Sequence, residues 1–102
     1  MASTKEHRDF ILEQLSGAPN ITCRPMMGEF LLYSNNVLFG GIYDDRLLVK
    51  IAPENAAYSM PTEVPYPSAK PMYLIEDVDD KAKLAEIVDA TVSSLETKNF
   101  KA

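Results

Sequence analysis

Few residues of this sequence could make or break covalent bonds. The single cysteine, Cys23, and the single histidine, His7, are the pair from which a thiol nucleophile and its base could be assembled. Neither belongs to a catalytic motif, and the sequence contains no GxSxG elbow and no HExxH helix. We interpret Cys23 as a buried or boundary thiol and His7 as a surface or boundary histidine. We therefore expect a protein that is not an enzyme.

Two groups of acidic residues could also do chemistry. Glu29, Asp44 and Asp45 could form a carboxylate pair for acid–base work, but the two aspartates stand in a predicted turn, where solvated acids are common. The acidic stretch 77–80 could attract a divalent cation, yet it lacks the glycine and the distal glutamate of an EF-hand loop. Because it precedes a predicted helix, we interpret it as helix capping and predict neither a metal nor a cofactor.

Three basic residues are candidates for holding an anion: Arg24, Lys50 and Lys70. A small-ligand-binding protein or an enzyme could use them in this way, although the same residues are typical of a solvated surface. The chain as a whole is acidic, with 15 acidic and 10 basic residues and a net charge of −5. Since backbone-driven binding of nucleic acid needs clustered cations that displace counterions, direct contact with nucleic acid is disfavoured.

The stretch "NVLFGGIYDDRLLVK" (36–50) places Gly40 and Gly41 inside an apolar run. A phosphate-binding loop needs its glycines between a strand end and a helix start, and the GxGxxG and Walker spacings are absent. In the middle of a strand, a residue without a Cβ leaves room for the cross-strand rings and side chains of Phe30 and Leu31, or allows a bulge that bends the strand. We predict one of these two structural roles for the pair.

The elements that position these residues follow from hydrophobic spacing. A helix is predicted over 3–17, with Ser3 and Glu6 as a capping box and Gly17 after its end. Alternating apolar residues then predict strands at 26–34, 37–43 and 46–51, joined by tight turns at 35–36 and 44–45.

The second half of the chain begins with a short helix at 53–60, which Pro53 can open. Four prolines make 61–71 an extended connection, and a strand at 72–76 and a helix from the acidic stretch to about 98 follow. The order α-β-β-β-α-β-α predicts a single α+β domain over 1–102, with helices on one face of a predominantly antiparallel sheet.

Two-residue turns predict the strand register. Leu32 would face Phe39, Phe30 would face Gly41, and Gly41 would face Leu48. One face of the sheet would then be aliphatic and pack under the helices. The other would be a partly exposed aromatic surface that binds a protein partner or a second copy of the chain. Its residues are Phe30, Leu32, Phe39, Tyr43 and Leu48, with Arg46 and Lys50 beside them.

The compartment follows from three sequence features. The N-terminal segment "MASTKEHRDF" has no apolar region of the kind that a secretory signal needs, and one cysteine cannot form an intrachain disulfide. No stretch approaches the roughly 18 apolar residues of a membrane span. We expect a cytoplasmic protein with no membrane contact.

Two segments carry a family resemblance: "RPMMGEFLLYSNNVLFGGIYDDRLLVK" and, downstream, "AKPMYLIEDVDD". They resemble the TfoX N-terminal domain family, and the likeness covers nearly the whole chain. The resemblance implies a bacterial protein with a two-layer, secretion-chaperone-like fold and a link to natural competence, in which larger relatives act as transcriptional co-regulators. Those relatives carry a further helical domain after this module.

Together, these features favour a non-enzymatic regulatory module that acts through protein contacts, with the transcription machinery as an expected partner. The alternative is a protein that binds a small anion, or an enzyme acting on one, through the three basic residues named above.

Overall fold

The structure is a computed structural model that describes residues 4–18 and 20–101, with side chains described as far as Leu95. Its elements in chain order are α1 (Lys5–Gln14), the 3-10 turn η1 (Leu15–Gly17), β1 (Ile21–Met26), β2 (Glu29–Ser34), β3 (Val37–Tyr43), β4 (Arg46–Val49), the 3-10 helix η2 (Pro53–Tyr58), β5 (Thr62–Glu63), β6 (Met72–Leu74) and α2 (Lys81–Lys101). This composition confirms the α+β class.

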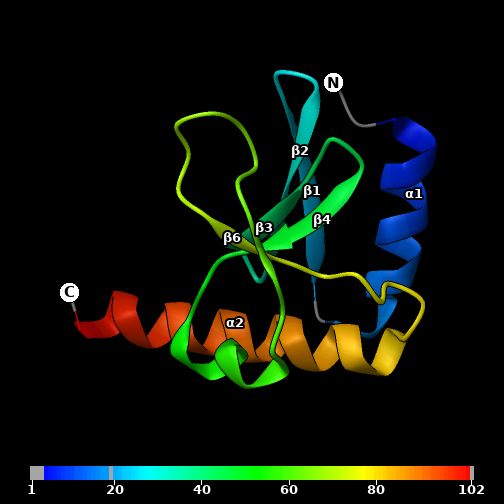
Figure 1. Ribbon diagram of the computed structural model, residues 1–102. Helices are drawn as coiled ribbons and strands as arrows, with labels where there is room; N and C mark the ends of the chain where they lie inside the picture. Colours follow the sequence, from blue (N-terminus) through cyan, green and yellow to red (C-terminus); the bar gives the residue numbers. More distant parts are fainter. Residues whose placement is uncertain (1–3, 19, 102) are drawn as a thin grey trace.

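The strands form one six-stranded sheet in the order β1-β2-β3-β4-β6-β5, and every neighbouring pair is antiparallel. Figure 1 shows α2 running beneath the sheet and α1 standing beside the β1–β2 hairpin. Side chains of both helices join sheet residues in a single buried cluster. The predicted packing of helices against one sheet face is therefore confirmed.

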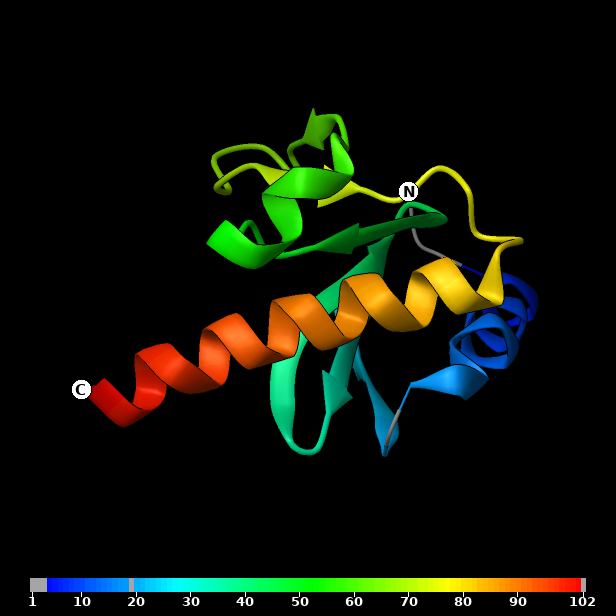
Figure 2. The same ribbon diagram turned by 90° about the horizontal axis from the view of Figure 1, so that it is seen from below.

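As far as Leu95, the long helix α2 has one apolar stripe, as the spacing of its residues predicts. Leu84, Ile87, Val88 and Val92 in this stripe are buried, and Leu95 is partly buried against the core. Figure 2 shows the helix lying across the strands. Among the described residues, no helix has both the length and the apolar character that a membrane span requires.

Both helices begin at side-chain caps. The Thr4 hydroxyl accepts a hydrogen bond from the His7 N–H at 3.1 Å, whereas the predicted capping residue Ser3 lies outside the described part of the chain. The Asp80 carboxylate accepts from the Lys83 N–H at 3.0 Å. This second bond confirms helix capping as the role of Asp80, because it pairs an N–H group that has no partner within the helix.

The two predicted hairpin turns are confirmed. Asn35 and Asn36 have φ angles of 50° and 66°, and Asp44 and Asp45 have 52° and 58°. Asparagine and aspartate tolerate this left-handed conformation, which matches the twist of the flanking strands. Both hairpins close at the predicted pairs, Ser34 with Val37 and Tyr43 with Arg46.

The structure differs from the prediction at the sheet edges. The strand predicted at 26–34 is shorter, because Met27 and Gly28 turn the chain with φ angles of 51° and 87° and separate β2 from β1, a strand that was not predicted. Pro25 obscures β1 in the sequence, but a proline is tolerated here because β1 is an edge strand. The two-residue strand β5 lies within the connection 61–71, which was predicted to be extended but not to pair with the sheet.

A β-bulge changes the predicted register between β2 and β3. Tyr33 pairs with Leu38, but Leu32 pairs with Gly40, so Phe39 is an extra residue without a direct partner. The predicted pair Leu32–Phe39 is therefore wrong, and the pairs of β2 beyond it are shifted by one residue. The register between β3 and β4 is as predicted, with Gly41 opposite Leu48.

The bulge also changes which residues face the helices, so the predicted aromatic surface is not exposed. Phe30, Leu32 and Phe39 belong to the cluster under the helices, together with Ile42 and Leu47 from the face that was predicted to be aliphatic. The expectation of a partly exposed surface is wrong for all five of its residues, none of which is more than 7% exposed: Phe30, Leu32, Phe39, Tyr43 and Leu48.

The glycine pair allows a close approach, but to backbone atoms and the Tyr43 ring and not to the predicted side chains of Phe30 and Leu31. A Cβ on Gly40 would lie 2.1 Å from the Leu48 carbonyl oxygen and 2.9 Å from the Val49 Cα. A Cβ on Gly41 would lie 2.6 Å from the Phe30 carbonyl oxygen and 2.8 Å from the Tyr43 ring. At both positions the obstacle includes backbone, so a larger residue displaces a strand and not merely a side chain.

Replacing Gly40 by alanine is expected to destabilise the fold by about 3 kcal/mol, since the added methyl group overlaps the backbone of β4. Gly17→Ala is the matched control, because its Cβ would lie at an ordinary 3.4 Å from the Ala85 Cβ; it should change stability by at most about 1 kcal/mol. Urea unfolding followed by circular dichroism measures both. Equal stabilities of the two variants would contradict the close approach.

Candidate functional site

A cavity of about 530 Å³ opens between the end of β4 and the segment 61–71. Its size falls within the range of pockets that bind small molecules. The sheet contributes part of its lining, the proline-containing segment another part, and Leu95 of α2 the remainder. The lining residues are Leu38, Gly40, Tyr43, Lys50, Ile51, Pro65, Tyr66, Ala69, Lys70, Pro71, Met72 and Leu95.

The sheet side of the cavity is fixed where β4 ends. The Lys50 N–H donates a hydrogen bond to the Phe39 carbonyl at 2.8 Å, which continues the β3–β4 pairing past the last residue of the strand. The Lys50 carbonyl accepts from the Asn55 side-chain amide, also at 2.8 Å. Both backbone groups of Lys50 are therefore held, while its side chain is half-buried at the cavity wall.

Asn55 anchors the chain after Lys50. It is fully buried; its amide also donates to the Thr91 hydroxyl of α2 at 2.8 Å, and its carbonyl accepts from the Ala52 N–H at 3.0 Å. A buried amide with all these partners holds η2 against α2, because losing any of them leaves a polar group unpaired away from water.

The opposite wall of the cavity is the segment 61–71. Its two ends are brought together by the β5–β6 pairing and by the hydrogen bond from the Leu74 N–H to the Pro61 carbonyl, at 2.8 Å. Within the segment, the Ala69 N–H donates to the Tyr66 carbonyl at 3.1 Å. Prolines limit the remaining freedom of the segment, since each fixes its own φ angle and restricts the residue before it.

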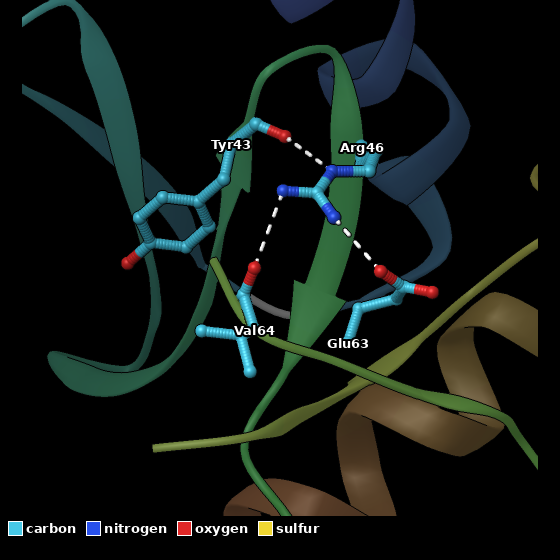
Figure 3. Close-up of polar contacts among 4 residues, drawn as sticks. All are labelled: Tyr43, Arg46, Glu63 and Val64. Atoms are coloured by element: carbon cyan, nitrogen blue, oxygen red, sulfur yellow. Dashed lines mark hydrogen bonds and ion pairs between the residues drawn. The ribbon is translucent and has the colours of Figure 1, made fainter. Parts of the chain in front are cut away.

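Arg46 fastens this wall to the β3–β4 hairpin, as Figure 3 shows. Its guanidinium donates to the Tyr43 carbonyl and the Glu63 carboxylate, both at 3.2 Å, and to the Val64 carbonyl at 3.5 Å. A planar group with several fixed donors can bridge three acceptors in this way. Arg46 was predicted to lie beside a partner surface. The structure places it in this contact between the β3–β4 hairpin and the segment 61–71, which we call the latch.

Two tyrosines meet at the cavity. The rings of Tyr43 and Tyr66 are tilted, with their centroids 6.3 Å apart. Burial raises the pKa of the Tyr43 phenol above its ordinary value of 10.0, and the nearby Tyr66, Glu29 and Tyr33 raise it further. Tyr43 therefore presents a neutral phenol at physiological pH.

The lining of the cavity is basic although the protein is acidic. Among the described residues that line it, Lys50 and Lys70 are the charged ones, and none is a carboxylate. Within residues 4–18 and 20–95, neither lysine side chain forms an ion pair or a hydrogen bond. Their charges are thus uncompensated next to a concave surface.

The structure separates the third predicted anion ligand from these two. Arg24 lies on the edge strand β1 and lines a different pocket, of about 510 Å³, with Thr22, Cys23, Tyr33 and Asn36. The predicted set of three basic residues is therefore not one site, because β1 and the segment 61–71 are at opposite ends of the sheet order.

The other candidates from the sequence are engaged in structural contacts. Burial raises the pKa of the Cys23 thiol, the reverse of what activates a nucleophile. The His7 ring packs near the Phe10 ring, with centroids 6.0 Å apart. The Glu29 carboxylate accepts from the Asp44 N–H at 3.1 Å and stabilises the hairpin turn. Across the described residues, no cluster of three or more His, Cys, Asp or Glu could hold a metal ion.

Sequence reasoning missed Tyr43 and Tyr66 as cavity residues, and Arg46 as the residue that positions one wall. The run of four prolines was a usable signal, since a stiff connection of that length must lie over some surface. Which surface it covers depends on the pairing of β4 with β6, which joins distant parts of the chain.

A family model and a known protein are similar to this chain. The model of the TfoX N-terminal domain family matches residues 13–95, a range that includes every residue of the cavity lining. The chain is also similar to a protein of Spirochaeta aurantia described as an uncharacterized 12.7 kDa protein in the trpE 5′ region. The two are 26% identical over 98 residues, which cover 93% of this chain and 85% of that protein.

Arg46→Ala is expected to loosen the outer wall without unfolding the protein. The Leu74 amide, which is bonded to the Pro61 carbonyl, should exchange about three- to tenfold faster, because a partly exposed ion pair and its neighbouring hydrogen bonds are lost. Hydrogen–deuterium exchange measures this. Lys81→Ala, which removes an ion pair with Glu13 on another element, is the control; an equal effect of both changes would contradict the latch.

Stability should fall at alkaline pH, in part through Tyr43. Its folded-state pKa lies above the unfolded value of 10.0, so its contribution is complete below that pH and is lost as pH rises through the folded pKa. Tyr43→Phe should reduce the slope of the unfolding free energy against pH in this range. Urea unfolding at a series of pH values tests this, and an unchanged slope would count against the assignment.

Proposed function

Since the chain belongs to the TfoX N-terminal domain family, which is linked to natural competence, we propose that it is a non-enzymatic regulatory module that acts through contact with another protein. The partner that this role requires is a component of the transcription machinery or one of its regulators. A second copy of the chain is the alternative occupant of the same surface.

The proposal rests on one surface, which we call the apolar rim: Ile51, Val64 and Tyr66. These side chains are 46%, 45% and 52% exposed, and they are three of the five large apolar side chains exposed in the described structure. Ile51 and Tyr66 line the same cavity, and Val64 precedes its lining residue Pro65. Exposed apolar side chains that gather at one place are typical of interaction surfaces.

The arrangement of the rim suits a stable contact. Val64 is held at its carbonyl by Arg46, and Tyr66 lies against the Tyr43 ring. A backbone that is already held needs little further ordering on binding, which favours affinity. Tyrosine is also among the residues that contribute most to interface energies.

The chemistry of the remaining residues supports a binding role. A thiol whose pKa is raised by burial is a weak nucleophile at neutral pH, and this is the state of Cys23. A net charge of −5 disfavours direct contact with a nucleic-acid backbone. Regulation of transcription by this domain therefore works through a protein surface.

Site-specific photocrosslinking in the native cell tests this function. A photoreactive phenylalanine analogue at position 66 should yield a discrete adduct with one protein. The same group at position 27, in the β1–β2 turn, should not, although Met27 is 97% exposed. With the partner purified, Ile51→Glu should weaken the complex by about tenfold or more, because it places a charge in an apolar contact.

Three results would contradict the proposal: no adduct at position 66, the same adducts at positions 66 and 27, or tight binding of duplex DNA by the isolated protein. An adduct formed with the chain itself, accompanied by dimers in sedimentation, would assign the rim to self-association in place of a different partner.

A further inference from the structure

We propose that the cavity is a binding site for an amphipathic organic anion: a molecule with one carboxylate or phosphate group and an apolar body. This goes beyond the contact surface proposed above. It rests on the charge, the lining, the size and the rigidity of the cavity.

The charge of the cavity selects an anion. Lys50 and Lys70 come from segments far apart in the sequence and line one concave surface, and no carboxylate lines it among the side chains described as far as Leu95. In a protein of net charge −5, two unpaired lysines at one site oppose the overall charge. A lysine side chain is a flexible stem with a compact charge, so both ammonium groups can adjust to one anionic group from the cavity wall.

The remainder of the lining selects an apolar body. Leu38, Ile51, Pro65, Met72 and Leu95 supply aliphatic surface on several sides. Tyr43 and Tyr66 add aromatic surface and two phenol groups. A fully hydrophilic anion would leave this surface unused, whereas an apolar chain or ring that displaces water from it gains free energy in proportion to the area buried.

The walls of the cavity are held in place before any ligand binds. Asn55 and the extended β3–β4 pairing fix the backbone of Lys50. On the other side, Arg46 and the β5–β6 pairing hold the segment that carries Lys70. A site formed in advance needs little ordering on binding, which favours small ligands.

Calorimetric titration of the full chain with defined probes tests the site. Octanoate supplies a carboxylate and hexyl phosphate supplies a phosphate, so the two arms distinguish the anionic groups. Octanol and inorganic phosphate each lack one half of the proposed ligand and should bind far more weakly. Along the series from butyrate to octanoate, affinity should rise about fourfold for each CH₂ group that becomes buried.

Substitutions then locate the binding. Lys50→Ala and Lys70→Ala should each weaken the better probe by about tenfold, the loss expected when one charged partner is removed. Arg24→Ala, a basic residue outside the cavity, is the matched control and should change affinity by less than about twofold. The thermal midpoint of each variant without probe shows whether it is folded.

The outcomes decide the proposal. Failure of both amphipathic anions to bind at millimolar concentration overturns it, as does equal binding of octanol and octanoate. Binding that Arg24→Ala weakens as much as the lysine variants overturns the location. Folded lysine variants that lose the probe but keep the crosslink at position 66 would support the site and leave the protein contact standing separately.

Discussion

The close approach of two backbones at Gly40 is the constraint on which the rest of the structure depends. The Leu48 carbonyl occupies the space where a side chain would stand. This contact lets β3 bulge at Phe39 while it remains paired with β4, so that Phe39 turns into the core beside Phe30 and Leu32. A bulge increases local twist, and here it converts what alternation would make an aromatic surface into the interior of the domain.

From this constraint the cavity follows by a short chain of contacts. The Phe39 carbonyl accepts a hydrogen bond from the Lys50 N–H beyond the end of β4. The Asn55 side-chain amide donates to the Lys50 carbonyl and also to a hydroxyl of α2, and so connects this backbone to the helix. On the far side, Arg46 holds Glu63 and Val64 and thereby places the proline-containing segment over the sheet. Hydrogen bonds that stabilise the fold thus also determine the shape of this cavity.

Much of the fold is predictable because its signals are local. Asn35-Asn36 and Asp44-Asp45 identify their turns through their own backbone preferences, and the apolar stripe of α2 reports its buried face directly. The bulge at Phe39 is not local: it depends on how the ring packs under helices distant in the sequence. The site was predictable only in part. Lys50 and Lys70 are recognisable in the sequence as basic residues, but only the long-range pairing of β4 with β6 brings them to one cavity. The sequence around Arg24 does not indicate that this residue lines a different pocket.

Ile51 and Tyr66 each have two environments, because they line the cavity and also stand in the apolar rim. Whatever covers these side chains from outside also changes access to the space behind them. Thermodynamic reciprocity then applies: any factor by which an occupant of the interior alters affinity at the exterior must operate with the same magnitude in the other direction. Under the two proposals made above, these shared side chains would couple the binding of a small anion to the binding of a protein partner.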